Sequence, residues 1–458
     1  MTAATAGGGL FERWRVSGRE VAVVGLGKSG VSATLLLRSL AIPVYASDSG
    51  TGPVFDGWAH TLREAGAVVQ TGGHDLERIA RSVAVVVAPG VPPDVPALEA
   101  ARRAGLDIHA EIDIGFVALR GTHCIGITGT NGKTTTTSLI AHVLVSAGVR
   151  AETAGNIGCP LCEVARSSNR PDWLALELSS FQLHDAPNLR PAIGVLTNLA
   201  PNHLDRYSTL DQYYGDKALL FRNADSASFW VTNADDPAVE EMTRSLPGTR
   251  ARFSIQRRAD AWYDRRGRRL MLGDGAVLSR SELPLLGDHN VANALAAVLV
   301  AARTGCPTDR IAEGLRSFRA IPHRVEPVRE VNGVLWINDS KSTNITSTEV
   351  AVAALDRRFV LLLGGRHKGE PYTRLAQPLQ DRCRAVVAYG EAGPLIVKDL
   401  SPSLNVVPAG SFADVLTVAG ELAQPGDAVL LSPACSSYDM FRNYEERGDR
   451  FRAAVEAL

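Results

Sequence analysis

The sequence has no long apolar run, no excess of charge of one sign and no charged leader followed by an apolar segment. Its apolar stretches fall well short of the roughly 18 residues that mark a membrane-spanning helix, and the start, MTAATAGGGLFERW, is unlike a signal peptide. We therefore expect a cytoplasmic protein that does not enter a membrane. The formal net charge of −1 provides no basic field for nucleic acid, so phosphate binding must arise from local arrangements.

Cysteine is scarce too, with six residues in 458, and only Cys159 and Cys162 form a C-x-x-C pair. No second Cys or His pair stands nearby to complete a zinc site. A redox pair is the alternative, but the thiols of cytosolic proteins are normally reduced. We therefore assign the cysteines to packing.

Strand-like and helix-like runs alternate from end to end, which predicts an α/β protein with parallel sheets. Apolar residues make up 45% of the chain, enough for an ample core, and the length favours about three domains. Residues 249–283 differ, because they are rich in arginine and their short alternating runs predict small antiparallel strands. The stretch FRAIPHRVE at 318–326 is expected to cross into a last block of parallel strands.

The first glycine-rich loop, VAVVGLGKSG at 21–30, has the form of a dinucleotide-binding fingerprint. Gly25, Gly27 and Gly30 fit G-x-G-x-x-G, and Asp48 ends the next strand-like run, where a ribose-binding carboxylate is expected. An NAD-dependent dehydrogenase is one interpretation. However, nothing downstream indicates a site for hydride transfer, and a glycine turn at a helix N-terminus binds any pyrophosphate.

The second glycine-rich loop, GTNGKT at 129–134, lies between a predicted buried strand and a predicted helix. Glycines allow the backbone to wrap around phosphate oxygens, while Lys133 can neutralise β- and γ-phosphates and Thr134 can ligate Mg²⁺. The strict pattern needs glycine at position 127, which is Ile127 here. The strand–loop–helix context nevertheless predicts ATP binding.

Three polar residues downstream are candidates for metal binding or catalysis. Glu177 ends the apolar run WLALE, His203 follows the run AIGVLTN, and Lys217 lies on a predicted amphipathic helix. A carboxylate at a strand end suits Mg²⁺. Position alone leaves other interpretations open: a cap or solvent-facing strand end for Glu177, a structural role for His203, and a surface lysine for Lys217.

Taken together, the motifs of the chain resemble those of the Mur ligases, in the same order and over essentially the whole length. NDSKSTN and SPACSSYDMF match the members that add D-glutamate, whereas the others are loosely shared with related Mur ligases and with folylpolyglutamate synthase. The motifs are GTNGKTTTT, ELSSFQL, LTNLAPNHLDRY, GDHNVANALAA, IPHRVE, NDSKSTN and SPACSSYDMFRNYEERG.

The resemblance implies three α/β domains: a Rossmann-like domain for the UDP substrate (1–112), a P-loop mononucleotide-binding domain for ATP (113–320) and a Rossmann-like domain for the amino acid (321–458). It implies ATP-dependent ligation of D-glutamate to UDP-N-acetylmuramoyl-L-alanine through an acyl phosphate, releasing ADP and phosphate. The setting would be cytoplasmic peptidoglycan precursor synthesis, and the enzyme would be a monomer with two Mg²⁺ ions. A sibling ligase for another amino acid and an inactive nucleotide sensor are the alternatives.

The resemblance also implies roles for single residues. Lys133, His203 and Lys217 would be catalytic, with His203 a candidate base for the incoming amine. Thr134 and Glu177 would hold one Mg²⁺ and His203 a second, while Lys217 would carry a CO₂-derived carbamate whose negative charge supports the metal. Contacts to ATP are implied for Gly129, Thr130, Asn131, Gly132, Lys133, Thr134, Thr135, Asn290, Asn293, His323, Arg324, Asp339 and Lys341.

The remaining implied contacts belong to the other two substrates. Tyr444 departs from the family pattern, where phenylalanine is expected, and it retains an aromatic wall with an added hydroxyl. The UDP substrate would contact Lys28, Ser29, Asp48, Ser49, Gly90, Asn156 and His203. D-Glutamate would contact Thr343, Lys368, Ser437 and Tyr444.

Overall fold

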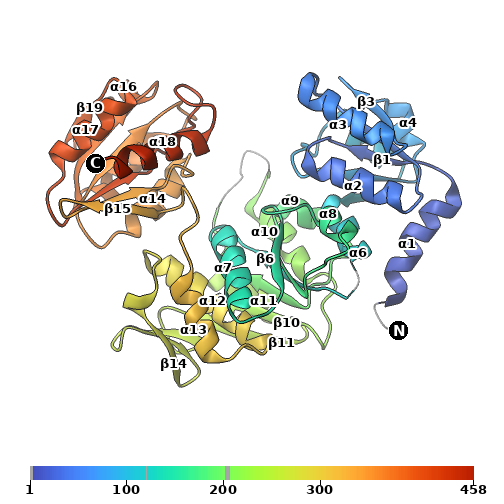
Figure 1. Ribbon diagram of the computed structural model, residues 1–458, viewed down its shortest axis with the longest axis horizontal. Coiled ribbons are helices and arrows are strands. Elements are labelled where there is room, and N and C mark those ends of the chain that lie inside the picture. The colour runs from blue at the N-terminus through green and yellow to red at the C-terminus, as the bar shows by residue number, and fades with distance from the viewer. Residues whose placement is uncertain (1–3, 120, 202–206) are drawn as a thin grey trace. The chain divides into compact units, whose positions relative to one another are not determined.

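The chain forms three sheets with helices packed against them, as the computed structural model shows for residues 4–119, 121–201 and 207–458 (Figure 1). The chain separates into two compact units, the first of residues 1–282 and 292–316 and the second of residues 283–291 and 317–458. The first unit holds two sheets and the second unit holds one. The three predicted domain ranges therefore stay a prediction.

The first sheet is parallel throughout and has the strand order β3-β2-β1-β4-β5. The apolar runs VAVV and AVVV are buried at every position because alternate side chains enter cores on both faces of the sheet. The order reverses at β1, beside β4, which is where such sheets bind ligands. The predicted Rossmann-like fold is confirmed. The strands are β1 Val21–Val24, β2 Val44–Asp48, β3 Val68–Thr71, β4 Ala84–Val87 and β5 Ile108–Ala110, and the helices are α1 Ala4–Ser17, α2 Lys28–Ser39, α3 Pro53–Glu64, α4 Leu76–Ala80, α5 Pro96–Arg103 and α6 Glu111–Ala118.

The central sheet is mixed, with the order β14-β13-β12-β11-β10-β9-β6-β8-β7. The strands from β7 to β12 in this order run parallel, and β12, β13 and β14 pair antiparallel. The strands are β6 His123–Thr128, β7 Ala151–Gly155, β8 Trp173–Glu177, β9 Ile193–Leu196, β10 Phe229–Asn233, β11 Thr249–Ser254, β12 Ala261–Asp264, β13 Arg269–Leu272 and β14 Gly275–Ser279. The helices are α7 Lys133–Ser146, α8 Leu161–Arg166, α9 Ser180–His184, α10 Leu210–Ala218, α11 Pro237–Thr243, α12 Asp288–Arg303 and α13 Thr308–Ser317.

The antiparallel strands predicted within residues 249–283 are confirmed for β12 to β14 but wrong for β11, which pairs parallel with β10. The sequence TRARFS alternates because Ala251 and Phe253 are buried while Arg252 is exposed. Alternation records that one side of a strand faces solvent. It carries no information about the direction of the neighbouring strand.

The third sheet, with the order β15-β16-β20-β17-β18-β19, is parallel except for a hairpin of β15 and β16 at one edge. The run FVLLLG of β17 sends alternate side chains into two cores, one with α14 to α16 and one with α17 and α18, so helices cover both faces. The strands are β15 Glu326–Val331, β16 Val334–Asn338, β17 Phe359–Gly364, β18 Cys383–Tyr389, β19 Val406–Pro408 and β20 Ala428–Leu431, and the helices are α14 Ile345–Ala353, α15 Ala376–Leu379, α16 Gly393–Leu400, α17 Phe412–Leu422 and α18 Tyr444–Glu456.

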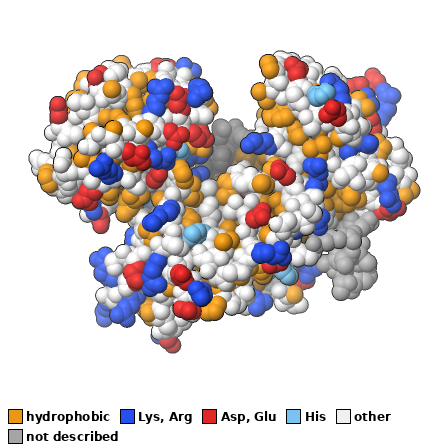
Figure 2. Space-filling view, in the orientation of Figure 1, with side chains coloured by type: hydrophobic (Ala, Val, Ile, Leu, Met, Phe, Trp, Pro, Cys, Tyr) orange, Lys and Arg blue, Asp and Glu red, His pale blue; other side chains and the backbone are white. Residues whose placement is uncertain are grey.

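The surface carries charges of both signs. Figure 2 shows Lys and Arg side chains interspersed with Asp and Glu over the visible face, as the small net charge leads one to expect. Among the described residues, no helix has the length and apolar character required to cross a bilayer. All six cysteines are free, and four of them, Cys162 included, are buried, whereas Cys159 is exposed.

Candidate functional site

Two positions of the loop between β6 and α7 strongly favour glycine. Gly129 has φ +144° and Gly132 has φ +81°. A Cβ on Gly129 would lie 2.0 Å from Oγ1 of Thr197, and one on Gly132 would lie 2.5 Å from Oδ1 of Asn293. A larger residue would therefore be strained in its backbone and would displace the side chain of Thr197 or Asn293.

The loop is fastened to the segment that follows β9. The backbone N–H of Thr130 donates to the carbonyl of Asn198 at 2.8 Å, and the N–H of Asn131 donates to Asn198 Oδ1 at 2.9 Å. The Nζ of Lys133 lies over the loop, 3.0 Å from the carbonyl oxygen of Gly129 and 2.9 Å from that of Thr130. This strand–loop–helix arrangement, with the first amides of α7 at Lys133, Thr134 and Thr135, is that of a phosphate cradle.

The two asparagines predicted to contact ATP are both buried on α12, and they lie in different units. In the first unit, Asn293 Oδ1 accepts from Oγ1 of Thr136 at 3.1 Å, directly behind the loop. In the second unit, Nδ2 of Asn290 donates to the carbonyl of Leu286 at 2.8 Å.

Lys217 is not a surface residue, and that interpretation of it is wrong. The residue is only 1% exposed, and its Nζ donates to the carbonyl of Gly129 at 2.7 Å and lies 4.6 Å from the ring centroid of Tyr213. Burial and the nearby charge of Lys133 lower the pKa of Lys217 from 10.5 to about 6, although Asp216 acts in the opposite direction. Near neutral pH the amine is therefore mostly uncharged, unlike that of an ordinary lysine.

Glu177 is likewise buried, at 2% exposure, at the end of β8. Its Oε1 accepts from Nδ2 of Asn156 at 2.9 Å, whereas no donor among the described residues reaches the buried Oε2. Ser179, not Glu177, caps the following helix α9, so the cap and solvent-facing interpretations of Glu177 are wrong. A buried carboxylate oxygen without a donor fits a cation ligand, and the residues present therefore fit Mg²⁺.

Thr134 and His203 are the two further candidates for metal binding. Thr134 lies in the first turn of α7. His203 lies outside the described residues.

The loop after β1 borders a cavity of about 420 Å³ at the switch point of the first sheet. Gly30 packs on the loop so closely that a Cβ would lie 1.8 Å from the carbonyl oxygen of Gly25. The cavity brings together five of the residues predicted to bind the UDP substrate: Lys28, Ser29, Asp48, Ser49 and Gly90. Asn156, predicted with them, is not among the residues that line it and lies beside Glu177 instead.

Asp48 uses both carboxylate oxygens to hold this loop. Its Oδ2 accepts from the N–H of Leu26 at 2.6 Å, and its Oδ1 accepts from the N–H of Gly50 at 2.7 Å. The carboxylate therefore shapes the cavity as well as lining it.

In the second unit, the crossover segment is joined to the turn after β16. The carbonyl of His323 accepts from the N–H of Lys341 at 3.1 Å, and the N–H of Val325 donates to Oδ1 of Asp339 at 3.1 Å. Asp339 also accepts from Oγ of Ser432 at 2.8 Å, and burial raises its pKa to about 6. These bonds bring His323, Asp339 and Lys341, all predicted to contact ATP, onto one connected backbone framework; Arg324, predicted with them, belongs to the same crossover segment.

Of the residues predicted to bind D-glutamate, Thr343 and Lys368 contact each other, whereas Tyr444 contacts Lys341, which is predicted to bind ATP. The Nζ of Lys341 lies 3.8 Å from the ring centroid of Tyr444, and the Nζ of Lys368 donates to Oγ1 of Thr343 at 3.2 Å. Ser437 is buried in the turn after β20, where its carbonyl accepts from the N–H groups of two following residues.

Models of one family match three successive parts of the chain. Residues 19–110 match the Mur ligase MurD-like N-terminal domain, residues 127–301 the Mur ligase middle domain, and residues 323–435 the Mur ligase glutamate ligase domain. Proteins named UDP-N-acetylmuramoylalanine--D-glutamate ligase are 38% identical in Acidobacterium capsulatum (96% of this chain, 97% of that protein) and 40% identical in Salinibacter ruber (95% and 97%). The chain belongs to the Mur ligase family.

Solved structures of other ligases share the fold. The UDP-N-acetylmuramate-alanine ligase of Thermotoga maritima gives a TM-score of 0.60 at 19% identity, covering 96% of this chain and 99% of that one. A pseudomurein peptide ligase type C from Methanothermus fervidus gives 0.58 at 19% identity, covering 96% and 100%. Mur ligases use ATP, which agrees with the phosphate cradle at α7.

Sequence reasoning missed two residues of this Mur ligase. His74 lines the cavity of the first sheet, with Nδ1 2.9 Å from Oγ of Ser47, and burial lowers its pKa. Its position just beyond β3, at the carboxyl edge of the sheet, was the available signal.

The second missed residue is Arg447 of α18, whose side chain is fully buried. Its guanidinium donates to the carbonyl of Ser340 at 2.8 Å, to the carbonyl of Cys435 at 3.2 Å from two nitrogens, and to Oγ of Ser340 at 2.9 Å. Arg447 thereby joins the loop NDSKSTN to the loop SPACSS. Nothing in the run EERGDRF distinguishes it from its solvent-facing neighbours.

Proposed function

We propose that this Mur ligase joins D-glutamate to UDP-N-acetylmuramoyl-L-alanine with ATP, releasing ADP and phosphate, in cytoplasmic peptidoglycan precursor synthesis. The observation that carries the proposal is the near-full-length similarity to proteins named for this reaction. Three features of the structure support it: the phosphate cradle, the carboxylate oxygen of Glu177 that has no donor among the described residues, and the neutral amine of Lys217. We propose that the enzyme acts as a monomer.

A carboxylate does not react with an amine, so ATP serves to activate it. In the first step a carboxylate oxygen of the L-alanyl substrate attacks the γ-phosphorus of ATP, and ADP leaves with the electrons of the broken bond. In the second step the amine of D-glutamate attacks the acyl carbon, and phosphate leaves. The first step brings two anions together, so charge neutralisation and positioning are the main tasks of the protein.

The residues of the β6–α7 loop are assigned to the first step. The amides of α7 and Lys133 would bind the β- and γ-phosphates, and Asn293 would hold the loop from behind. Thr134 and Glu177 would hold one Mg²⁺, and His203 with carbamylated Lys217 would support a second; when bound, the ions would neutralise phosphate charge. His203 is proposed as the base that takes a proton from the amine.

The other two substrates are assigned to the two Rossmann-like sheets. Lys28 and Ser29, with the loop held by Asp48, would bind the uridine diphosphate in the cavity beside β1. Thr343, Lys368, Ser437 and Tyr444 would bind D-glutamate, whose carboxylates suit cationic and hydroxyl groups.

Glu177→Gln tests the metal assignment. We expect kcat to fall by about 10²–10³-fold, with a raised Mg²⁺ requirement, because the amide keeps the shape of the side chain but removes the negative charge. Titration of activity with MgCl₂ at saturating ATP measures both effects. Asp172→Asn, at a half-exposed ion pair on the surface, is the matched control, and an unchanged Mg²⁺ dependence in Glu177→Gln would contradict the assignment.

The reaction itself is tested by phosphate release from ATP and Mg²⁺ with UDP-N-acetylmuramoyl-L-alanine. D-Glutamate, L-glutamate, L-lysine and diaminopimelate are added in turn. We expect release with D-glutamate alone. Stimulation by another amino acid would indicate a sibling specificity, and no release despite ATP binding would indicate a nucleotide sensor.

A further inference from the structure

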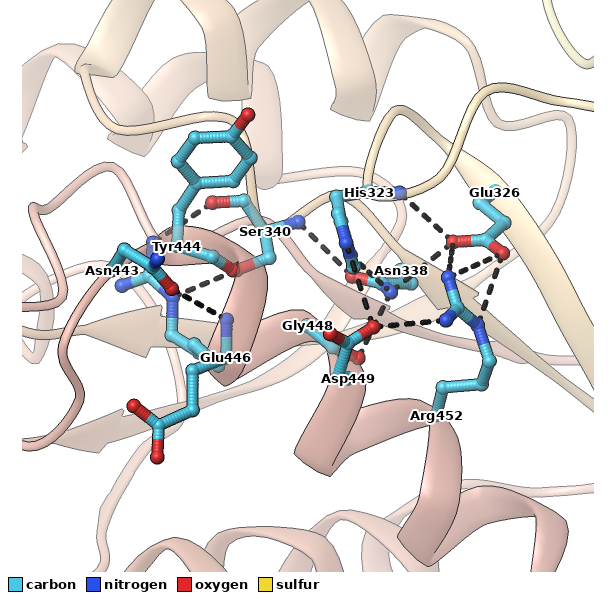
Figure 3. Close-up of polar contacts among 11 residues, drawn as sticks. His323, Glu326, Asn338, Ser340, Asn443, Tyr444, Glu446, Gly448, Asp449 and Arg452 are labelled. Atoms are coloured by element: carbon cyan, nitrogen blue, oxygen red, sulfur yellow. Dashed lines mark hydrogen bonds and ion pairs between the residues drawn. The ribbon is translucent and has the colours of Figure 1, made fainter. Parts of the chain in front are cut away.

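His323 occupies a constrained position in the second unit. Its backbone has φ +64°, and its ring packs on Gly448 of α18, where a Cβ would lie 2.1 Å from Nδ1 of the ring. The residue is only 6% exposed. Its N–H donates to Oε2 of Glu326 at 2.9 Å, so backbone and ring are both held (Figure 3).

The side-chain amide of Asn338 contacts this ring, and a second hydrogen bond defines which way the amide faces. Its Oδ1 accepts from the N–H of Ser340 at 3.2 Å, so Nδ2 must point the other way. Nδ2 lies 3.1 Å from Nδ1 of His323, 3.2 Å from Oε2 of Glu326 and 3.1 Å from the carbonyl of Gly448. Figure 3 shows this amide between the ring and the carboxylate.

An amide nitrogen donates and cannot accept. A hydrogen on Nδ1 of His323 would therefore point at another donor only 3.1 Å away. The favourable arrangement leaves Nδ1 bare and puts the ring hydrogen on Nε2.

Burial favours the neutral form of the ring, against most of the surrounding charges. Arg452 pairs with Glu326 at 2.9 Å and with Asp449 at 3.0 Å, which partly neutralises both carboxylates. Nε2 of His323 lies 3.7 Å from Oδ1 of Asp449, and Glu445 is also near. Burial outweighs these carboxylates and lowers the pKa of His323.

We propose that Asn338 is a positioning residue that holds His323 as the neutral Nε2–H tautomer, so that the ring offers one hydrogen-bond donor to an oxygen of the nucleotide. The tautomer follows from the contacts above. The nucleotide contact rests on the proposed function.

The first test is ¹⁵N NMR of the histidine rings in the full-length protein without substrates. The His323 signal is identified by its disappearance in His323→Gln. We expect Nε2 to carry the hydrogen and Nδ1 to be bare at neutral pH. A protonated Nδ1, as the other tautomer or as imidazolium, would overturn the proposal even if ligase activity were normal.

The second test changes the positioning residue. Asn338→Asp replaces the donor by an acceptor. At a pH high enough to keep the ring neutral, the hydrogen should therefore move from Nε2 to Nδ1, and Kd for ADP should rise about tenfold, the value of one hydrogen bond. Asn405→Asp, at an exposed position, should change neither. An unchanged tautomer or an unchanged Kd in a folded Asn338→Asp protein would overturn the proposal.

Two substitutions of His323 test the proposal if the Asn338→Asp protein does not fold. Glutamine at 323 can place an amide donor near the position of Nε2, whereas asparagine reaches only the position of Nδ1. Asparagine tolerates positive φ well, so backbone strain would not explain a loss of ADP affinity in His323→Asn. We expect His323→Asn to raise Kd for ADP about tenfold and His323→Gln to raise it much less; equal effects would contradict the donor role. ADP binding and NMR need no D-glutamate, so a wrong assignment of the reaction would be recognised separately.

Discussion

Replacing Lys133 with methionine is expected to lower kcat by about 10²–10³-fold while the protein stays folded. Methionine approximates the length and volume of the lysine stem but carries no charge. The Nζ of Lys133 lies within hydrogen-bonding distance of two carbonyls of the β6–α7 loop, so its charge is held at the place proposed for the γ-phosphate. Phosphate release under saturating ATP measures the effect.

The Lys133→Met replacement should also change the protonation of Lys217. Because the charge of Lys133 helps to lower the pKa of Lys217, Lys133→Met should leave Lys217 more protonated at neutral pH and less able to react with CO₂. Lys398→Met, on the exposed side of α16, removes a lysine charge away from the loop and should leave kcat unchanged. A Lys133→Met enzyme with normal kcat would contradict the role assigned to the loop.

Replacing Lys217 with methionine should inactivate the enzyme and stabilise its fold. In CO₂-free buffer near pH 7 we expect the free energy of unfolding to rise by roughly 2–4 kcal/mol, since a buried amine that must lose its proton is exchanged for an apolar side chain. The lost hydrogen bond to Gly129 offsets about 1 kcal/mol of this gain. Urea unfolding measures the difference.

The stability difference between wild type and Lys217→Met should depend on pH, because the pKa of Lys217 differs between the folded and unfolded states. Unfolded Lys217 binds its proton up to about pH 10.5, and folded Lys217 only up to about pH 6. Between these values unfolding takes up a proton, so the wild-type protein becomes more stable as the pH rises from 6 to 10.5. The advantage of Lys217→Met should therefore be largest near pH 6 and shrink towards pH 10, whereas Lys398→Met should show no such trend. A variant less stable than wild type across this range would indicate that Lys217 is not buried as an amine.

Much of this fold could be predicted because apolar runs and glycine loops are local signals. VAVV and AVVV became fully buried strands, and GTNGKT became the turn after β6 together with the first residues of α7. The direction of β11 could not be predicted, since side-chain alternation is the same in parallel and antiparallel strands.

The candidate site was less accessible to sequence reasoning, because its chemistry depends on contacts between distant segments. Lys217 lies in the polar run DQYYGDKA, and its buried amine donates to the carbonyl of Gly129, which is 88 residues away. Arg447 resembles its exposed neighbours until the loops at Ser340 and Cys435 close around it. The resemblance to the family implied roles for matching positions. It could not indicate which neighbouring residues hold those side chains in place.

The contacts of Arg447 bear on how amino-acid specificity can change during evolution. Three of its four hydrogen bonds end on main-chain carbonyls, which every residue type provides. Side chains in the two loops can therefore be exchanged while the distance between the loops is preserved. Selection for a different amino acid can act on positions such as 343 and 437, which we propose to contact the amino acid, without first having to rebuild the backbone that supports them.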